Sequence, residues 1–151
     1  MLPVLKKPLL TEKQRETRLS WIRNHQGQDW KKVIFSDEKT FFFMKQGRLL
    51  VRRYSNETVV RPTVKHPPKL YIWGCFCYSH FINLTIFNYT LTGIGYVKIL
   101  RRGLLPYLRS HPRKHYIFQE DNDSKHQSRI ATTIKSQNGI RVLDWPQILR
   151  T

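Results

Sequence analysis

The spacing of apolar and polar positions changes several times along the chain, and each change predicts a different element. Residues 11–24 open with a Thr that is followed three positions later by a Gln, which is a capping-box pattern. Apolar residues then recur at helical spacing among basic ones, which predicts a basic amphipathic helix. We therefore interpret residues 1–29 as a helical lead into a core formed by residues 30–151.

The next part of the chain has the short apolar runs that are typical of β-strands. Residues 30–37 predict a buried strand that ends on an acidic pair, Asp37 and Glu38. Residues 40–44 and 48–53 predict a hairpin, and residues 56–68 predict a basic connection. Residues 69–78 and 81–87 predict either another hairpin or one long bent strand.

Helical spacing returns at Gly95, where apolar residues fall on one face over residues 96–108. Pro106 is expected to kink or end that helix. Residues 115–121 then predict a strand, residues 125–137 a helix closed by Asn138 and Gly139, and residues 140–145 a last strand. This order predicts an α/β fold with a mixed sheet, with no internal repeat and no clear domain boundary.

Charge narrows the range of partners. The chain has 27 Lys and Arg against 10 Asp and Glu, so its formal net charge is +17. That excess suits a polyanion, with nucleic acid as the first candidate and a ribosomal-type or membrane-surface protein as the alternatives. No apolar run approaches the roughly 20 residues of a membrane span, so we expect a soluble protein with no membrane partner. Cys75 and Cys77 lie one residue apart in an apolar stretch and are expected to be core thiols.

Two carboxylates, Asp37 and Asp121, each close an apolar strand. If the first and fourth strands of a mixed sheet lie side by side, these two strand ends meet. Paired Asp side chains suit Mg²⁺, which prefers oxygen ligands, and two such ions promote the displacement chemistry of a phosphodiester. Strands also end in Asp because the residue suits turns, so spacing alone leaves both interpretations open.

Four short segments add a more specific signal. In chain order they are Phe35-Ser36-Asp37-Glu38, Ile72-Trp73-Gly74-Cys75, residues 118–126 and Leu143-Asp144-Trp145-Pro146. Together they resemble the successive signatures of DDE-type DNA transposases of the mariner superfamily, over roughly residues 12–146. The resemblance implies a ribonuclease H-like fold, a mixed sheet flanked by helices, and an acidic triad that binds Mg²⁺ or Mn²⁺. It also implies DNA as partner, a possible homodimer on DNA, a nuclear location and no small-molecule substrate.

The resemblance assigns roles position by position. Asp37 matches the first acid of the triad and Asp121 the second, so both are expected to be catalytic metal ligands. Asn122 and His126 match neighbours of the second acid and are expected to support it. For His126, a role in orienting a water or a DNA phosphate and a solvated place in the first turn of a helix both stay open.

Two further acids are given structural roles. Alternation along a strand turns Glu38 to the face opposite Asp37, so we expect it to support the site from behind. Asp123 is expected to cap the helix that follows, because Asx side chains accept backbone N–H bonds there.

The chain also departs from the family pattern. In the family, the Trp-Pro pair precedes a helix that carries the third acid, whereas Pro146 is followed here by five residues. Asp144, on the last predicted strand, is not expected to substitute. We therefore expect a truncated core that lacks the final helix, leaves one sheet face uncovered and has an incomplete two-metal site. The alternatives to an enzyme are a non-catalytic DNA-binding remnant and a decayed gene product.

The family's helix-turn-helix modules, which read the ends of the transposon, have no counterpart in the chain. Phosphate-driven, salt-sensitive DNA binding is therefore expected in place of sequence-specific recognition.

Overall fold

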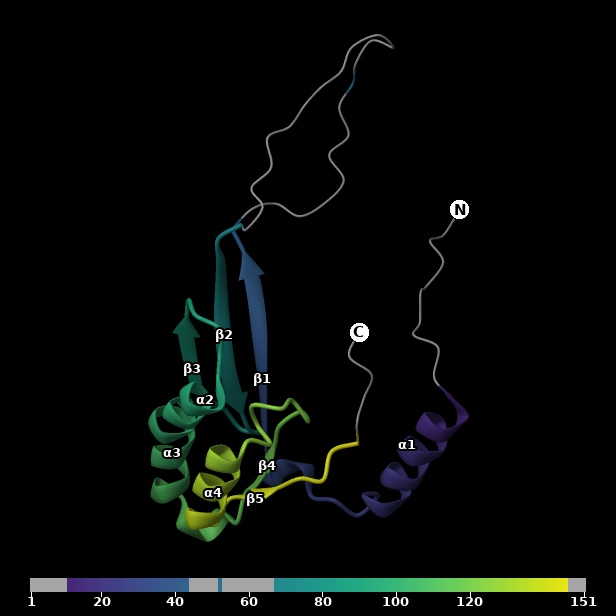
Figure 1. Ribbon diagram of the computed structural model, residues 1–151. Helices are drawn as coiled ribbons and strands as arrows, with labels where there is room; N and C mark the ends of the chain where they lie inside the picture. The colour runs from purple at the N-terminus through teal and green to yellow at the C-terminus, as the bar shows by residue number, and fades with distance from the viewer. Residues whose placement is uncertain (1–10, 44–51, 53–66, 147–151) are drawn as a thin grey trace.

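A five-stranded mixed sheet forms the centre of the protein (Figure 1). The computed structural model describes residues 11–43, 52 and 67–146. The strands lie in the order β3-β2-β1-β4-β5. Their bounds are β1 Val33–Phe42, β2 Lys69–Phe76, β3 Phe81–Phe87, β4 Ile117–Gln119 and β5 Arg141–Val142. β1, β2 and β3 are antiparallel neighbours, whereas β1, β4 and β5 run parallel, so the first and fourth strands are adjacent, as predicted.

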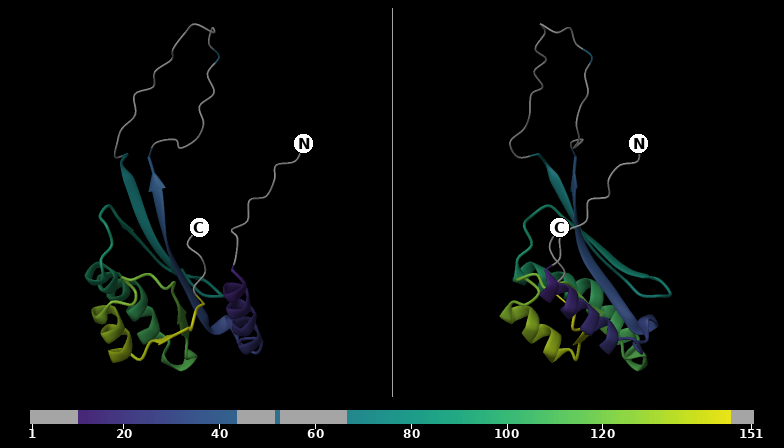
Figure 2. Two further views of the ribbon diagram at one scale, coloured as in Figure 1. Left: turned by 45° about the vertical axis from the view of Figure 1, so that its right-hand side comes forward. Right: turned by 90° about the vertical axis from the view of Figure 1, so that its right-hand side faces the viewer.

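Most of the helices pack on one face of this sheet, while the first stands apart from them (Figures 1 and 2). Their bounds are α1 Glu12–Asn24, α2 Gly93–Ile99, α3 Leu105–Ser110 and α4 Arg129–Gln137. Within the described residues, no helix has the length and apolar composition that crossing a bilayer would require.

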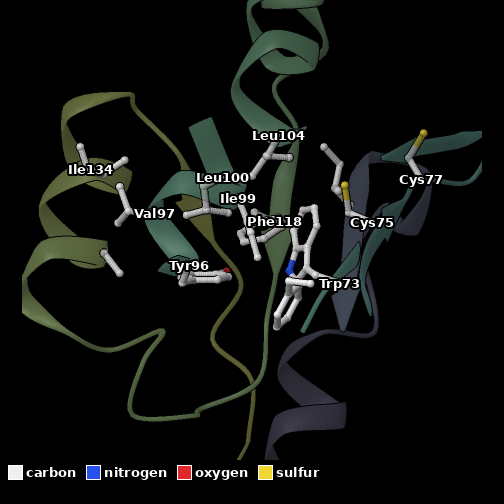
Figure 3. Close-up of a cluster of buried hydrophobic side chains, with 13 residues drawn as sticks. Trp73, Cys75, Cys77, Tyr96, Val97, Ile99, Leu100, Leu104, Phe118 and Ile134 are labelled. Atoms are coloured by element: carbon white, nitrogen blue, oxygen red, sulfur yellow. The ribbon is translucent and has the colours of Figure 1, made fainter. Parts of the chain in front are cut away.

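The sheet buries apolar side chains on both faces near the start of β1. Ile34 and Phe118 point to the helices and join Trp73 and Tyr96 in the main core (Figure 3). Val33, the next residue back, points to the other face, where it forms a second cluster with neighbours from β4, α1 and the segment after β5. Alternation along a strand explains this division, and it sets which face each later residue of β1 presents.

Beyond that second cluster, no helix or strand of the described residues covers the face of β2 and β3 that points away from the helices. The strand register places Leu84 opposite Gly74, which pairs in turn with Asp37. Leu84 is 48% exposed, and Ile86, two residues further along the same strand and face, is 56% exposed. On the side of Asp37, the described part of the sheet therefore presents apolar side chains that are about half exposed.

The segment around Pro106 is neither a simple kink nor a helix end. Residues 100–104 form a π-helical turn between α2 and α3, and the N–H of Leu105 donates to the carbonyl of Leu100. Pro106 then falls in the first turn of α3, where a missing N–H leaves no bond unmade. The wide turn therefore accommodates the proline without interrupting the helical path.

β1 is longer than predicted and begins later. Residues 30–32 form a 3₁₀ turn, so the strand starts at Val33, and it runs on to Phe42 because its second half pairs with the start of β2. The prediction of a separate strand from residue 40 was therefore wrong, and Asp37 lies within β1. The predicted hairpin turn and the basic connection fall almost entirely outside the described residues. Residues 69–87 form a hairpin of two strands, which decides between the two alternatives.

Other boundaries also differ from the predictions. α4 begins at Arg129, four residues later than predicted, because Asp123 to His126 form turns instead of helix. It ends as predicted, with Gly139 at φ +63° and the N–H of Ile140 donating to the carbonyl of Lys135. α1 has the predicted capping box at Thr11, but none of its residues is buried. Trp21 packs against the second cluster, whereas Leu19 and Ile22 of the predicted apolar side are exposed.

Candidate metal site

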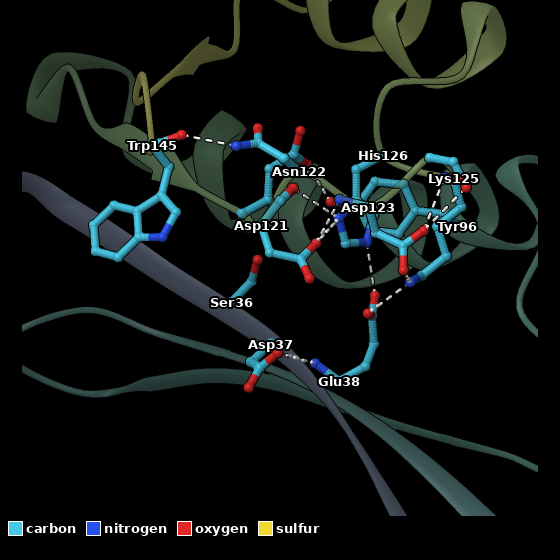
Figure 4. A network of polar contacts seen from close by, with 12 residues as sticks. Ser36, Asp37, Glu38, Tyr96, Asp121, Asn122, Asp123, Lys125, His126 and Trp145 are labelled. Carbon is cyan, nitrogen blue, oxygen red and sulfur yellow. Dashed lines mark hydrogen bonds and ion pairs between the residues drawn. The ribbon is translucent and has the colours of Figure 1, made fainter. Parts of the chain in front are cut away.

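Asp37 lies within β1, whereas Asp121 follows the end of β4 by two residues, so the predicted strand that ends on Asp121 is shorter than expected. The pairing between β1 and β4 ends at Phe35 and Gln119, and each acid follows its paired residue by two positions. Ser36 Oγ donates to the Gln119 carbonyl at 2.9 Å, which holds the two segments together just before the acids. Alternation turns Asp37 to the face of β1 opposite Glu38, while the Asp121 carboxylate, beyond the end of β4, contacts His126. Figure 4 shows the two segments together.

In each of these carboxylates, one oxygen accepts a hydrogen bond from a backbone N–H one or two residues further along. Asp37 Oδ1 accepts from the N–H of Glu38 at 2.8 Å, and Asp121 Oδ1 accepts from the N–H of Asp123 at 3.0 Å. The Asp121 side chain is 54% exposed, so it has access to solvent. Two exposed carboxylates with an oxygen each to spare suit a hard divalent cation that keeps most of its water ligands. That they bind one stays a prediction.

Glu38 lies on the opposite side of β1, as alternation predicts, and takes part in a network under the helices (Figure 4). Its Oε2 is 3.1 Å from Lys125 Nζ, which also lies 2.9 Å from Asp123 Oδ2. Burial alone would raise the pKa of Asp123, but the hydrogen bonds and charge of Lys125 lower it to about 2. The prediction that Asp123 caps α4 was wrong, because the helix begins after Ser128. The Oδ1 of Asp123 instead accepts from the N–H of Lys125 and closes a turn.

His126 is a buried residue of this network and is 3% exposed. Its Nε2 is 2.9 Å from Glu38 Oε1, and its Nδ1 is 2.7 Å from Asp121 Oδ1. Burial alone would lower the pKa of His126, but the hydrogen bond and charge of Glu38, with smaller contributions from Asp121 and Glu120, raise it. The structure therefore contradicts the solvated alternative for this residue.

A buried ion pair that sequence reasoning missed lies directly behind Asp121. Glu120 is 2% exposed and is paired with Lys135 of α4, which is 5% exposed. The Tyr96 hydroxyl donates to the second oxygen of Glu120, and burial, followed by the charge of Glu120, raises the pKa of Tyr96 well above its usual value. The sequence did hold a signal, because alternation places Glu120 on the same core face as Phe118.

Asn122 and Asp144 connect the site to the chain after β5. Asn122 Nδ2 donates to the carbonyl of Trp145 at 2.8 Å, and the indole N–H of Trp21 donates to the carbonyl of Asp144. Over residues 11–43, 52 and 67–146, no three acidic, His or Cys side chains are grouped so that they could hold a metal ion. Asp144 therefore does not complete a triad with the two strand acids in this structure.

The fold is that of a known class of enzyme domain. The crystal structure of the catalytic domain of Mos1 mariner transposase matches with a TM-score of 0.62 at 18% identity, covering 94% of this chain and 65% of that one. The Mos1 paired-end complex with Mg matches with a TM-score of 0.71 at 17% identity, covering 97% and 48%. These likenesses confirm the predicted ribonuclease H-like fold.

Sequence relatives then identify the family. No family model matches the chain. The Tc1 transposase of Caenorhabditis elegans is 32% identical over 152 residues, which cover 94% of this chain and 55% of that protein. The Tcb2 transposase of Caenorhabditis briggsae is 32% identical, and the match covers 93% of this chain and 55% of that protein. The Tc3 transposase of Caenorhabditis elegans is 30% identical, and the match covers 92% of this chain and 43% of that protein. The chain is therefore a homologue of the Tc1- and Tc3-type transposases, which confirms the resemblance to the mariner superfamily, and it spans about half the length of these relatives.

Proposed function

We propose that the chain is the core of a DNA transposase in which Asp37 and Asp121 hold a divalent cation beside a DNA phosphodiester. The observation that carries this proposal is the register of β1 and β4, which sets the two acids at equivalent positions in a homologue of transposases. Solved Mos1 structures include a catalytic domain with Mn and a paired-end complex with a transposon end, which supports both the metal and the DNA.

The residues of the site fit Mg²⁺ or Mn²⁺ through the carboxylate oxygens that the chain leaves unengaged. When bound, such an ion supplies Lewis-acid stabilisation of negative charge on the phosphodiester and lowers the pKa of a bound water. The protein's own contribution is to hold one acid in β1 and the other just after the neighbouring strand β4, and to attract the DNA backbone with its net charge of +17.

The strength of cleavage is a separate proposal. A two-metal site takes a third acid as a rule, and the described residues do not group one with Asp37 and Asp121. Changes around a metal commonly cost 10- to 100-fold in affinity or activity. We therefore propose that this chain, acting alone, cleaves DNA slowly or not at all.

A second function, DNA binding without cleavage, is favoured by the same two observations: the large positive charge and the grouping of only two acids among the described residues. In that case, the fold would hold DNA through phosphate contacts and release it as salt rises.

The family resemblance also leads us to propose a homodimer on DNA and a nuclear location. Sedimentation of the DNA complex tests the homodimer, and imaging of a tagged chain tests the location.

Nicking of supercoiled plasmid with Mg²⁺ or Mn²⁺ separates the two functions. The variants are Asp37→Asn and Asp121→Asn, with Glu16→Gln on the exposed surface of α1 as a control that removes one negative charge elsewhere. Metal-dependent nicking that both Asp variants abolish and the control retains would establish the enzyme, and rapid nicking of this kind would also contradict slow cleavage. Nicking that survives in both Asp variants would contradict the site assignment.

A gel-shift titration tests DNA binding in parallel. If about six phosphates are contacted, affinity is expected to fall about 10³-fold between 50 and 200 mM salt. Binding of this kind without nicking supports the binding function. A chain that does not bind DNA at low salt would contradict both functions.

A further inference from the structure

His126 occupies a place in the fold that the metal-ligand assignment does not explain. A His in the loop before a helix is usually solvated, yet this ring is 3% exposed and both of its nitrogens face carboxylates from different segments. One carboxylate is Glu38 of β1, on the helix side of the sheet, and the other is Asp121 itself. The ring therefore connects β1, which carries Asp37, to the segment after β4, which carries Asp121.

The ring is held in place from several directions. The backbone N–H of His126 donates to the Asp123 carbonyl at 3.0 Å, and the backbone carbonyl of His126 accepts from Lys135 Nζ at 3.0 Å. The Tyr96 ring packs against the imidazole with centroids 4.2 Å apart. Lys135 and Tyr96 both also contact Glu120, so a buried and fully paired cluster fixes the imidazole.

The contact with Asp121 is specific to one oxygen. The imidazole Nδ1 lies 2.7 Å from Oδ1 and 3.1 Å from the backbone carbonyl of the same residue. The N–H of Asp123 also donates to Oδ1. With Oδ1 fixed by two donors, the rotation of the carboxylate is restricted, and Oδ2 is the oxygen left to face a cation.

We infer that His126 is a positioning residue, which fixes the direction of the Asp121 carboxylate for metal binding, and that Glu38 positions His126 in turn. This inference rests on the proposed metal site. Residues that orient a ligand in this way commonly contribute 10- to 100-fold to metal affinity. Glu38 thus acts on Asp121 from the opposite side of the sheet without touching the metal.

The first experiment needs no metal. In the NMR spectrum of the ¹⁵N-labelled full chain, the inference predicts a slowly exchanging ring N–H proton on Nε2 of His126, because the ring is buried and Nε2 faces Glu38 Oε1. Glu38→Ala should remove this signal, whereas Glu38→Gln, whose amide oxygen still accepts, should retain it. Failure to observe this proton in the native chain would overturn the inference.

The second experiment is a Mn²⁺ titration of the same chain, followed by paramagnetic broadening of the amides of residues 37–38 and 121–123. His126→Ala and His126→Gln should weaken Mn²⁺ binding by about 10- to 100-fold, and Glu38→Ala should weaken it more than Glu38→Gln. The matched control is His111→Gln, since His111 stacks on Tyr107 at 4.4 Å and bonds its carbonyl, yet is not paired with an acid. It should leave Mn²⁺ affinity within about twofold.

The outcomes separate the inference from the proposed function. Mn²⁺ binding that both His126 variants leave unchanged would overturn the positioning role and keep the metal site. A native chain that shows the ring N–H proton but no Mn²⁺ broadening would overturn the metal site, and with it the role of His126. Thermal melting shows whether each His126 variant is folded. If one of them is unfolded, the Mn²⁺ affinities of the other His126 variant and of the two Glu38 variants decide whether the positioning role holds.

Discussion

The buried pair of Glu120 and Lys135 gives the sharpest prediction about stability. Lys135→Met removes the cation and leaves the charge of Glu120 inside the core, where the Tyr96 hydroxyl is its one remaining side-chain donor among the described residues. Removing one member of a buried ion pair costs about 3–5 kcal/mol, because the remaining charge is uncompensated. Native domains are stable by about 5–15 kcal/mol, so this single change takes a large part of the total.

The double variant Lys135→Met, Glu120→Gln provides the critical comparison. Glu120→Gln alone should also cost about 3–5 kcal/mol, so independent effects would add to about 6–10 kcal/mol. Because the double variant buries no charge and Gln can still accept from Tyr96, we expect it to be no less stable than either single variant. Replacing both members of a buried pair is often neutral or stabilising.

Urea denaturation, followed by far-ultraviolet circular dichroism, measures these differences. At roughly 2–4 °C per kcal/mol for a chain of this size, Lys135→Met should also lower Tm by about 6–20 °C. The control is Lys98→Met, because Lys98 is exposed on α2 and its loss should change stability by under about 0.5 kcal/mol. A cost below 1 kcal/mol for Lys135→Met, or strict additivity in the double variant, would refute the reasoning.

Three further predictions concern other parts of the fold. Gly139→Ala should cost about 1 kcal/mol or more in urea denaturation, because φ is +63° there; an unchanged midpoint would contradict the assigned C-cap. Burial raises the pKa of Cys75 to about 12, whereas hydrogen bonds to its sulfur outweigh burial at Cys77 and lower its pKa to about 7. At pH 8–9, Cys77 is therefore largely thiolate and Cys75 is not, so mass spectrometry should find that iodoacetamide alkylates Cys77 before Cys75. The reverse order would be contrary evidence. Leu84→Thr with Ile86→Thr should reduce the fluorescence of a bound apolar dye while changing stability by under about 0.5 kcal/mol each, since both side chains are about half exposed.

The sequence predicted the elements whose patterns are local. The capping box at Thr11, the apolar runs of β2 and β3, and the glycine after α4 are signals within a few residues, and each is found where expected. The adjacency of β1 and β4 came from the idea that two acids at strand ends meet, and the sheet order agrees with it.

The errors in the sequence analysis come from distant contacts. β1 continues past Asp37 because its second half pairs with β2, and no pattern inside residues 37–42 fixes that partner. α4 starts late because the acids after β4 bond to Lys125 and to their own backbone, which closes turns before the helix begins. The burial of His126 likewise depends on Glu38 and Tyr96, which are far away in the sequence.

The central claim is that Asp37 and Asp121 bind one divalent cation between them. The most direct measurement is an anomalous difference map from crystals of the chain soaked in Mn²⁺, with Asp121→Asn crystals treated in the same way. The account predicts a peak that lies about 2.0–2.2 Å from one oxygen of each acid and disappears in the variant. A map without that peak, or with Mn²⁺ bound at other residues only, would contradict the account.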